Sequence, residues 1–128
     1  MITLSPAQVK KLHTKQLAAT GGADGIRDET MLESAVAAPF QTFGGVALYP
    51  VTEKIVRIAY SLVCNHPFVD GNKRIGTYVL LILLGLNGID VDFTDDDIVH
   101  IGLSLAAGKM SYKQLLYFVE EHITHGNL

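Results

Sequence analysis

The sequence predicts an all-α fold, a compact helical bundle around one buried helix, with no more β-structure than one small hairpin. Helix start and stop signals recur along the 128 residues, and apolar residues between them follow helical spacing. Residues 73–86 are apolar nearly all round, which is typical of a buried central helix. Since no repeat or linker interrupts the pattern, we expect a single domain over residues 1–128.

Two helices are predicted in the first third of the chain. A capping box formed by Ser5 and Gln8 begins the first helix, which ends at Gly21-Gly22. Asp28 begins the second helix, and Pro39 ends it because proline cannot continue a helical hydrogen-bond ladder. Residues 40–49 differ from both helices, with two short apolar runs around a pair of glycines, and either a small hairpin or a plain loop fits them.

Four further helices are predicted in the rest of the chain. A third helix covers about 51–65, and a fourth covers about 73–86 and stops at Asn87-Gly88. Capping signals at 94–97 and 111–114 begin the last two helices. The single cysteine, Cys64, excludes a disulfide within the chain and is interpreted as a reduced core thiol.

Charge and hydropathy exclude several function classes. The formal net charge of −3 argues against a broad grip on nucleic acid, which requires a basic face. The longest apolar run, 77–86, is too short to span a bilayer, and the N-terminus lacks the pattern of a signal peptide. We therefore expect a cytoplasmic protein that binds neither membranes nor nucleic acid directly.

The stretch from the third to the fourth helix, residues 66–74, contains more polar and charged side chains than a link between two core helices needs. It ends at the start of a helix, where unsatisfied backbone N–H groups and the helix dipole attract anions. Gly71 allows a phosphate to approach the backbone, and Lys73 and Arg74 add full positive charges. Asp70 is the hard oxygen ligand that Mg²⁺ prefers, and His66 can accept a hydroxyl proton near neutral pH. Together these groups point to phosphoryl-transfer chemistry.

Residues 66–74 closely resemble the signature of the Fic/Doc family, His-Pro-Phe-x-(Asp/Glu)-Gly-Asn-(Gly/Lys)-Arg, at every specified position. The resemblance extends over nearly the whole chain and is greatest to the Doc branch, the "death on curing" toxins. It implies a Fic-like helical bundle. The segments that carry it outside the signature are 25–28, 32–35, 42–45, 48–50 and 86–88.

The resemblance implies a role for each residue of the signature. His66 would be the general base, Phe68 would anchor the loop in the core, and Asp70 would hold Mg²⁺. The nucleotide phosphates would be bound by Gly71, Asn72, Lys73 and Arg74.

The resemblance also assigns a role to residues 42–48, which would form a flap that holds the target's backbone as an added strand. The docking residues would be Thr42, Phe43, Gly44, Gly45 and Val46.

Two positions depart from the AMP-transferring pattern of the family. Lys73 replaces the usual glycine, and Thr77 stands where a second arginine is expected. The Doc branch shares both changes, which implies transfer of the γ-phosphate of ATP to a hydroxyl of a translation factor, elongation factor Tu. The alternatives are transfer of AMP or another nucleotide, a catalytically silent antitoxin-binding module and, with less support, a metal-dependent nuclease.

We also expect that a separate antitoxin inhibits this protein. Many Fic proteins carry an inhibitory helix marked by Ser or Thr four residues before a Glu, and none of the five glutamates here has that neighbour. We therefore expect inhibition by a cognate antitoxin, Phd-like or similar, whose helix would cover the site.

Overall fold

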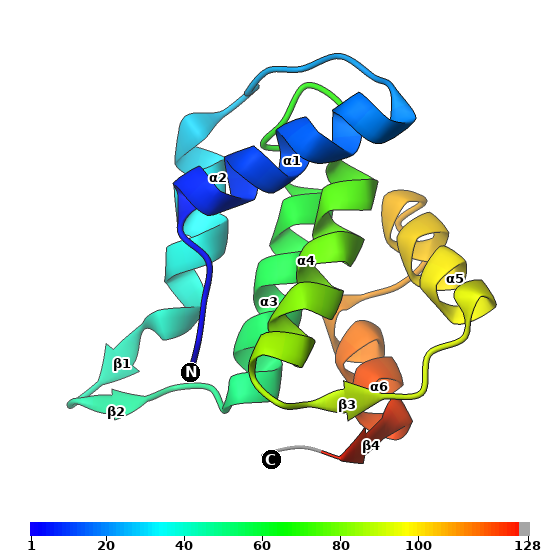
Figure 1. The fold of residues 1–128 in the computed structure, drawn as a ribbon. Helices are drawn as coiled ribbons and strands as arrows, with labels where there is room; N and C mark the ends of the chain where they lie inside the picture. The colour runs from blue at the N-terminus through cyan, green and yellow to red at the C-terminus, as the bar shows by residue number, and fades with distance from the viewer. Residues whose placement is uncertain (126–128) are drawn as a thin grey trace.

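The computed structural model describes residues 1–125, which form six α-helices, one short 3-10 helix and two small sheets (Figure 1). Among these residues, no helix combines the length and the apolar composition that crossing a bilayer requires. The helices are α1 (Pro6–Thr20), α2 (Glu29–Ala37), η1 (Ala38–Phe40), α3 (Val51–Cys64), α4 (Asn72–Leu86), α5 (Asp95–Ala106) and α6 (Tyr112–His122).

Helices α3 and α4 run antiparallel through the middle of the molecule, as the sequence predicts for residues 73–86 (Figure 1). Both bury a long apolar face, with Ile55 and Leu62 of α3 and Ile75 and Leu83 of α4 at most 1% exposed. The two helices approach each other closely at Gly76, where an added Cβ would clash with Val63 of α3. The other helices surround this pair, so the loop from α3 to α4 lies at one end of the core.

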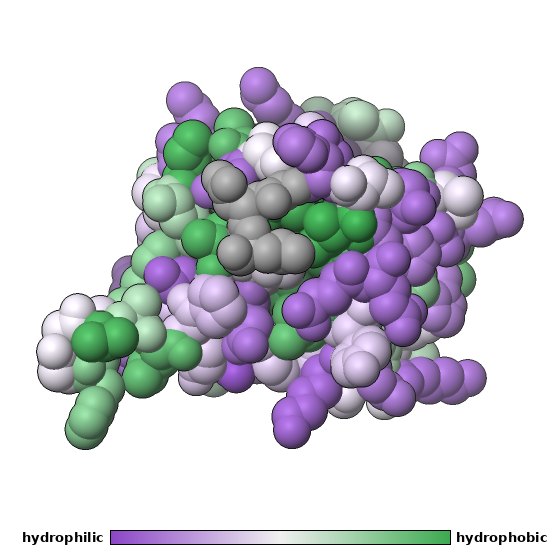
Figure 2. All heavy atoms as spheres, turned by 90° about the horizontal axis from the view of Figure 1, so that it is seen from below, coloured by the Kyte–Doolittle hydropathy of each residue, from purple (hydrophilic) through white to green (hydrophobic). Residues whose placement is uncertain are grey.

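The segment after η1 is the hairpin rather than the plain loop. Strands β1 (Thr42–Phe43) and β2 (Val46–Ala47) pair antiparallel. Gly44 and Gly45 both have positive φ, 59° and 81°, which a two-residue turn matched to strand twist requires. Seen from below, the hairpin projects from the body with apolar side chains, and Phe43 is 81% exposed (Figure 2).

A second two-stranded sheet accompanies the hairpin. Strand β3 (Asp90–Val91) pairs antiparallel with β4 (Ile123–His125) and ties the end of α6 to the segment after α4. Each strand has only two or three residues, too few for a pattern of alternation. Their pairing depends on how the helices bring distant segments together.

Candidate active site

The signature loop, which forms the first part of the 66–74 signature, leaves α3 through a residue with a strained backbone, His66. Helix α3 ends at Cys64, and His66 adopts φ 48°, a left-handed conformation that non-glycine residues seldom adopt. The backbone reverses direction there and enters the core at Pro67. The exposed imidazole of His66 faces the cleft described below.

Phe68 and Asn72 fix the middle of the loop. Phe68 is 1% exposed, in the core position that the sequence predicts for the anchor. The side-chain amide of Asn72 accepts a hydrogen bond from the backbone N–H of Phe68 and donates one to its carbonyl, both 3.0 Å. Since this amide is fully engaged with the protein, the contribution of Asn72 to anion binding would come from its backbone N–H.

The segment after α1 supports the loop through main-chain pairing that the sequence does not reveal. Ile26 forms an antiparallel bridge with Phe68, and the N–H of Val69 donates to the carbonyl of Gly25 at 3.1 Å. The side chain of Arg27 donates through Nε to the carbonyl of His66 at 2.6 Å and through a terminal nitrogen to that of the preceding residue at 2.8 Å. Arg27 thereby holds the strained bend in place.

Asp70 is held as a carboxylate. Its oxygens accept hydrogen bonds from the backbone N–H of Ala23 at 3.2 Å and of Gly71 at 2.8 Å. These two donors, with smaller contributions from Arg74 and His13, lower the pKa of Asp70 below its ordinary value. An ionised carboxylate near neutral pH is the form that binds a metal.

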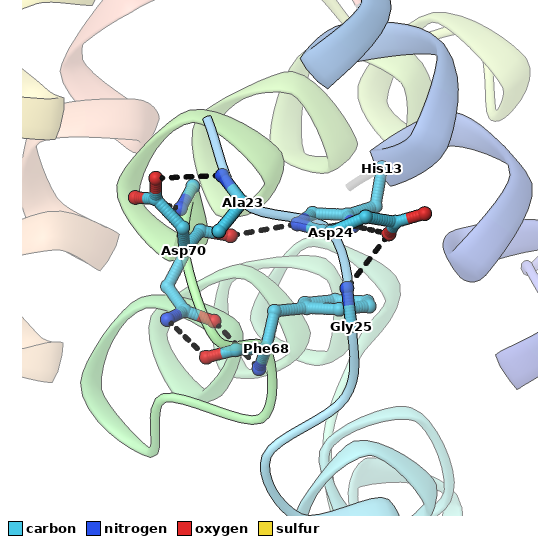
Figure 3. Close-up of polar contacts among 8 residues, drawn as sticks. His13, Ala23, Asp24, Gly25, Phe68 and Asp70 are labelled. Carbon is cyan, nitrogen blue, oxygen red and sulfur yellow. Dashed lines mark hydrogen bonds and ion pairs between the residues drawn. The ribbon is translucent and has the colours of Figure 1, made fainter. Parts of the chain in front are cut away.

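His13 is a site residue that the sequence interpretation missed. It is 1% exposed, its Nε2 donates to the carbonyl of Asp70 at 2.7 Å, and its ring stacks on Phe68 with centroids 3.8 Å apart (Figure 3). The carboxylate of Asp24 lies 3.8 Å from Nδ1. The sequence gives one indication that His13 is buried. It lies four residues from both Val9 and Leu17, which places it on the buried face of α1.

One cleft of about 600 Å³ brings the predicted catalytic, metal and anion-binding residues together. It is lined by Val63, His66, Val69, Asp70, Gly71, Asn72, Lys73, Arg74 and Ala106. Residues 72–74 are the first turn of α4, whose N–H groups have no intrahelical acceptors. Lys73 and Arg74 add two positive charges to this helix N-terminus, so the cleft can bind a polyphosphate.

Magnesium fits this residue set. Within residues 1–125 there is no cluster of three or more His, Cys, Asp or Glu side chains that could enclose a metal. Mg²⁺ does not need one, because it keeps several waters and binds through one or two carboxylates together with substrate phosphates. Asp70 lines the same cleft as Lys73 and Arg74, so it would be the carboxylate of such an arrangement.

The predicted flap is not part of this cleft. The hairpin directly precedes the N-terminal end of α3, whereas His66 follows its C-terminal end, so the two lie at opposite ends of that helix (Figure 1). Thr42, Phe43, Gly44, Gly45 and Val46 are all exposed and available for contact with a partner.

Comparison with known proteins agrees with the sequence signature and the helical fold. The "Toxin Doc" of Mycolicibacterium smegmatis is 39% identical over 85 residues, which cover 61% of this chain and 65% of that protein. The family model described as "Fic/DOC family" matches residues 3–84, which include α1 to α3, the hairpin, the signature loop and all but the last two residues of α4. The chain belongs to the Fic/DOC family.

Proposed function

We propose that this protein is the toxin of a toxin–antitoxin pair and a protein kinase that transfers the γ-phosphate of ATP to a hydroxyl of a translation factor. Elongation factor Tu is the target that the likeness to the Doc branch implies. The observation that carries the proposal is the common cleft of His66, Asp70, Lys73 and Arg74. A base, a metal ligand and an anion-binding helix end are the parts that phosphoryl transfer requires.

Each of these groups has a role in a single nucleophilic displacement at the γ-phosphorus of ATP. The imidazole of His66 accepts the proton of the target hydroxyl, whose oxygen forms a bond to the γ-phosphorus. The bond from that phosphorus to the β,γ-bridging oxygen breaks, and ADP leaves. The first turn of α4, with Lys73 and Arg74, holds the phosphates. Asp70 would hold Mg²⁺, which would supply charge neutralisation at the phosphate oxygens.

Two features of α4 favour phosphoryl over nucleotidyl transfer. The hydroxyl of Thr77 donates to the carbonyl of Lys73 at 2.9 Å, and an added Cβ on Gly102 of α5 would lie 3.4 Å from that hydroxyl oxygen. Thr77 therefore packs inside the α4–α5 contact and adds no positive charge to those of Lys73 and Arg74. With the positive charge concentrated at Lys73 and Arg74, we infer that the terminal phosphate is the one presented to His66.

An antitoxin helix would bind beside the same residues. An apolar groove of about 310 Å³ between α4 and α5 shares Lys73 and Arg74 with the catalytic cleft. Its wall includes the exposed side chains of Tyr78, Val99 and Leu103. A helix with an apolar stripe fits such a groove and would block the approach of a nucleotide. The relative named "Toxin Doc" supports this part of the proposal.

The test compares the transfer of label from the γ-phosphate of ATP with the transfer of label from its α-phosphate. Purified protein is incubated with bacterial extract and either γ-labelled or α-labelled ATP, with and without Mg²⁺. We expect label on a single protein from the γ-position only, and a loss of about a hundred- to ten-thousand-fold in rate for His66→Ala. Label from the α-position would establish nucleotidyl transfer instead. Retained toxicity of His66→Ala without any labelling would establish a silent binding module.

A further inference from the structure

A second polar cleft lies at the base of the hairpin, outside the catalytic cleft. Its volume is about 420 Å³. We name it the Arg57 cleft, and its main lining residues are Gln41, Tyr49, Arg57, Tyr60, Ser61 and Tyr112. The signature does not include any of these residues, and the proposed transfer step does not use them.

Arg57 is held against two aromatic rings. Its guanidinium carbon lies 3.9 Å from the ring centroid of Tyr49 and 4.2 Å from that of Tyr112. Attraction between a cation and the face of an aromatic ring orients the planar guanidinium group and leaves its N–H edge for other partners. The side chain is therefore arranged before any ligand arrives.

The charge of Arg57 has no carboxylate partner within residues 1–125 at ion-pair distance. Its Nε is buried and lacks a hydrogen-bond acceptor. Glu53, one turn earlier on α3, accepts a hydrogen bond from the hydroxyl of Tyr112 at 3.1 Å instead. A permanently charged guanidinium group whose Nε–H has no acceptor favours an incoming anion.

We propose that the Arg57 cleft binds the carboxylate side chain of a protein segment that pairs with the hairpin as an added strand. This inference rests on the proposed function for the presence of a protein target. Gln41 directly precedes β1 and Tyr49 follows soon after β2, so a strand added to the hairpin passes beside the cleft. Arginine binds a carboxylate through two parallel N–H···O bonds, which gives the site selectivity for Asp or Glu.

The experiment uses two blocked pentapeptides, acetyl-Thr-Val-Glu-Val-Thr-amide and its Gln counterpart. Each is titrated into the ¹⁵N-labelled full chain, and the Nε–H signal of Arg57 is followed by NMR. We expect the Glu peptide to shift this signal together with the amides of the hairpin, and to bind about tenfold or more tightly than the Gln peptide. Equal binding of the two peptides overturns the proposal.

Three variants test the origin of this preference. Arg57→Gln should abolish it, and Arg57→Lys, which keeps the charge but loses the planar fork, should reduce it strongly in a chain that still folds. Lys54→Gln is the matched control, because Lys54 is on α3, contacts Phe40 and does not line the cleft, so the preference should persist. A loss of preference in Lys54→Gln as large as that in Arg57→Gln overturns the proposal.

Inorganic phosphate alone and a catalytic variant complete the test. If phosphate shifts the Arg57 signal at the same concentration as the Glu peptide, the cleft is a site for free anions and the peptide assignment is wrong. His66→Ala should keep the full peptide preference, because the assay contains no ATP. If the unmodified protein transfers no phosphate in the labelling test but keeps the peptide preference, the proposed kinase activity is wrong and the Arg57 cleft stands.

Discussion

The buried imidazole of His13 donates a 2.7 Å hydrogen bond to the backbone carbonyl of Asp70, the residue to which we assign Mg²⁺. The same ring stacks on Phe68, the anchor of the signature loop, at an interplanar angle of 11°. One side chain from α1 therefore fixes two points of the loop, on either side of Val69. The position of the metal ligand depends on a residue far from the signature in sequence.

His13→Phe should separate these two contacts, because phenylalanine keeps the stacking and removes the donor. The carbonyl of Asp70 then lacks its partner, and we expect the free energy of unfolding to fall by about 1–3 kcal/mol. The Mg²⁺ concentration for half-maximal transfer should rise. Urea unfolding and a Mg²⁺ titration measure the two effects, with His125→Phe as the exposed control. A variant with native stability and native Mg²⁺ dependence would show that the hydrogen bond positions nothing.

Asp70→Asn should remove an acid-dependent part of the stability. The backbone donors at Ala23 and Gly71 lower the pKa of Asp70 below 3.8, so the folded state binds its proton less readily than the unfolded state. That stability is present above pH 3.8 and is lost as the pH falls through the lower folded value. The thermal midpoints of the two proteins should differ at neutral pH and should converge only in acid, as the pH falls below 3.8. A constant difference down to the lowest pH would contradict the prediction.

His66→Gly should separate activity from stability. His66 has φ 48°, and the left-handed conformation costs residues with a Cβ about 1 kcal/mol, a cost that glycine avoids. We expect the glycine variant to be more stable than His66→Ala by about that amount, the reverse of the order in a helix. Both variants should lack transfer activity. Guanidinium unfolding of the pair measures the difference, and a more stable alanine variant would show that the bend is unstrained.

Gly76→Ala should disturb the contact between α3 and α4. An added Cβ would clash with Val63 and lie 3.0 Å from the carbonyl oxygen of Ala59. Overpacking of this kind costs about 1–3 kcal/mol. Gly85→Ala on the same helix is the matched control, since its Cβ would meet nothing within 4 Å and should stabilise the helix by up to about 1 kcal/mol. Equal stabilities in chemical unfolding would refute the close approach.

Local signals account for the helices that the sequence predicts. The capping boxes at Ser5, Thr94 and Ser111 are all present, and Asp28 caps α2. Such signals act within four residues and can be interpreted without the tertiary fold. The signature is similarly compact, so seven of the residues that line the candidate cleft, Val69 among them, could be named from the sequence.

Contacts between distant segments could not be predicted in the same way. His13 carries no catalytic spacing, and Arg27 belongs to a segment with no regular pattern, although both hold the signature loop. The β3–β4 sheet joins strands that are too short to alternate. Asn72 is predicted to bind phosphate, and the pairing of its side-chain amide with Phe68 is a further contact that depends on how the loop bends.

The 14 residues of α3 separate the hairpin from His66, and a helix of that length spans about 21 Å. An extended chain advances about 3.3 Å per residue, so a target captured on the hairpin needs about six residues to reach the imidazole. If the proposed function holds, the length of α3 would select target hydroxyls by their distance along the substrate from the segment bound to the hairpin. Lengthening α3 by one turn should move the modified position along the same substrate by one or two residues.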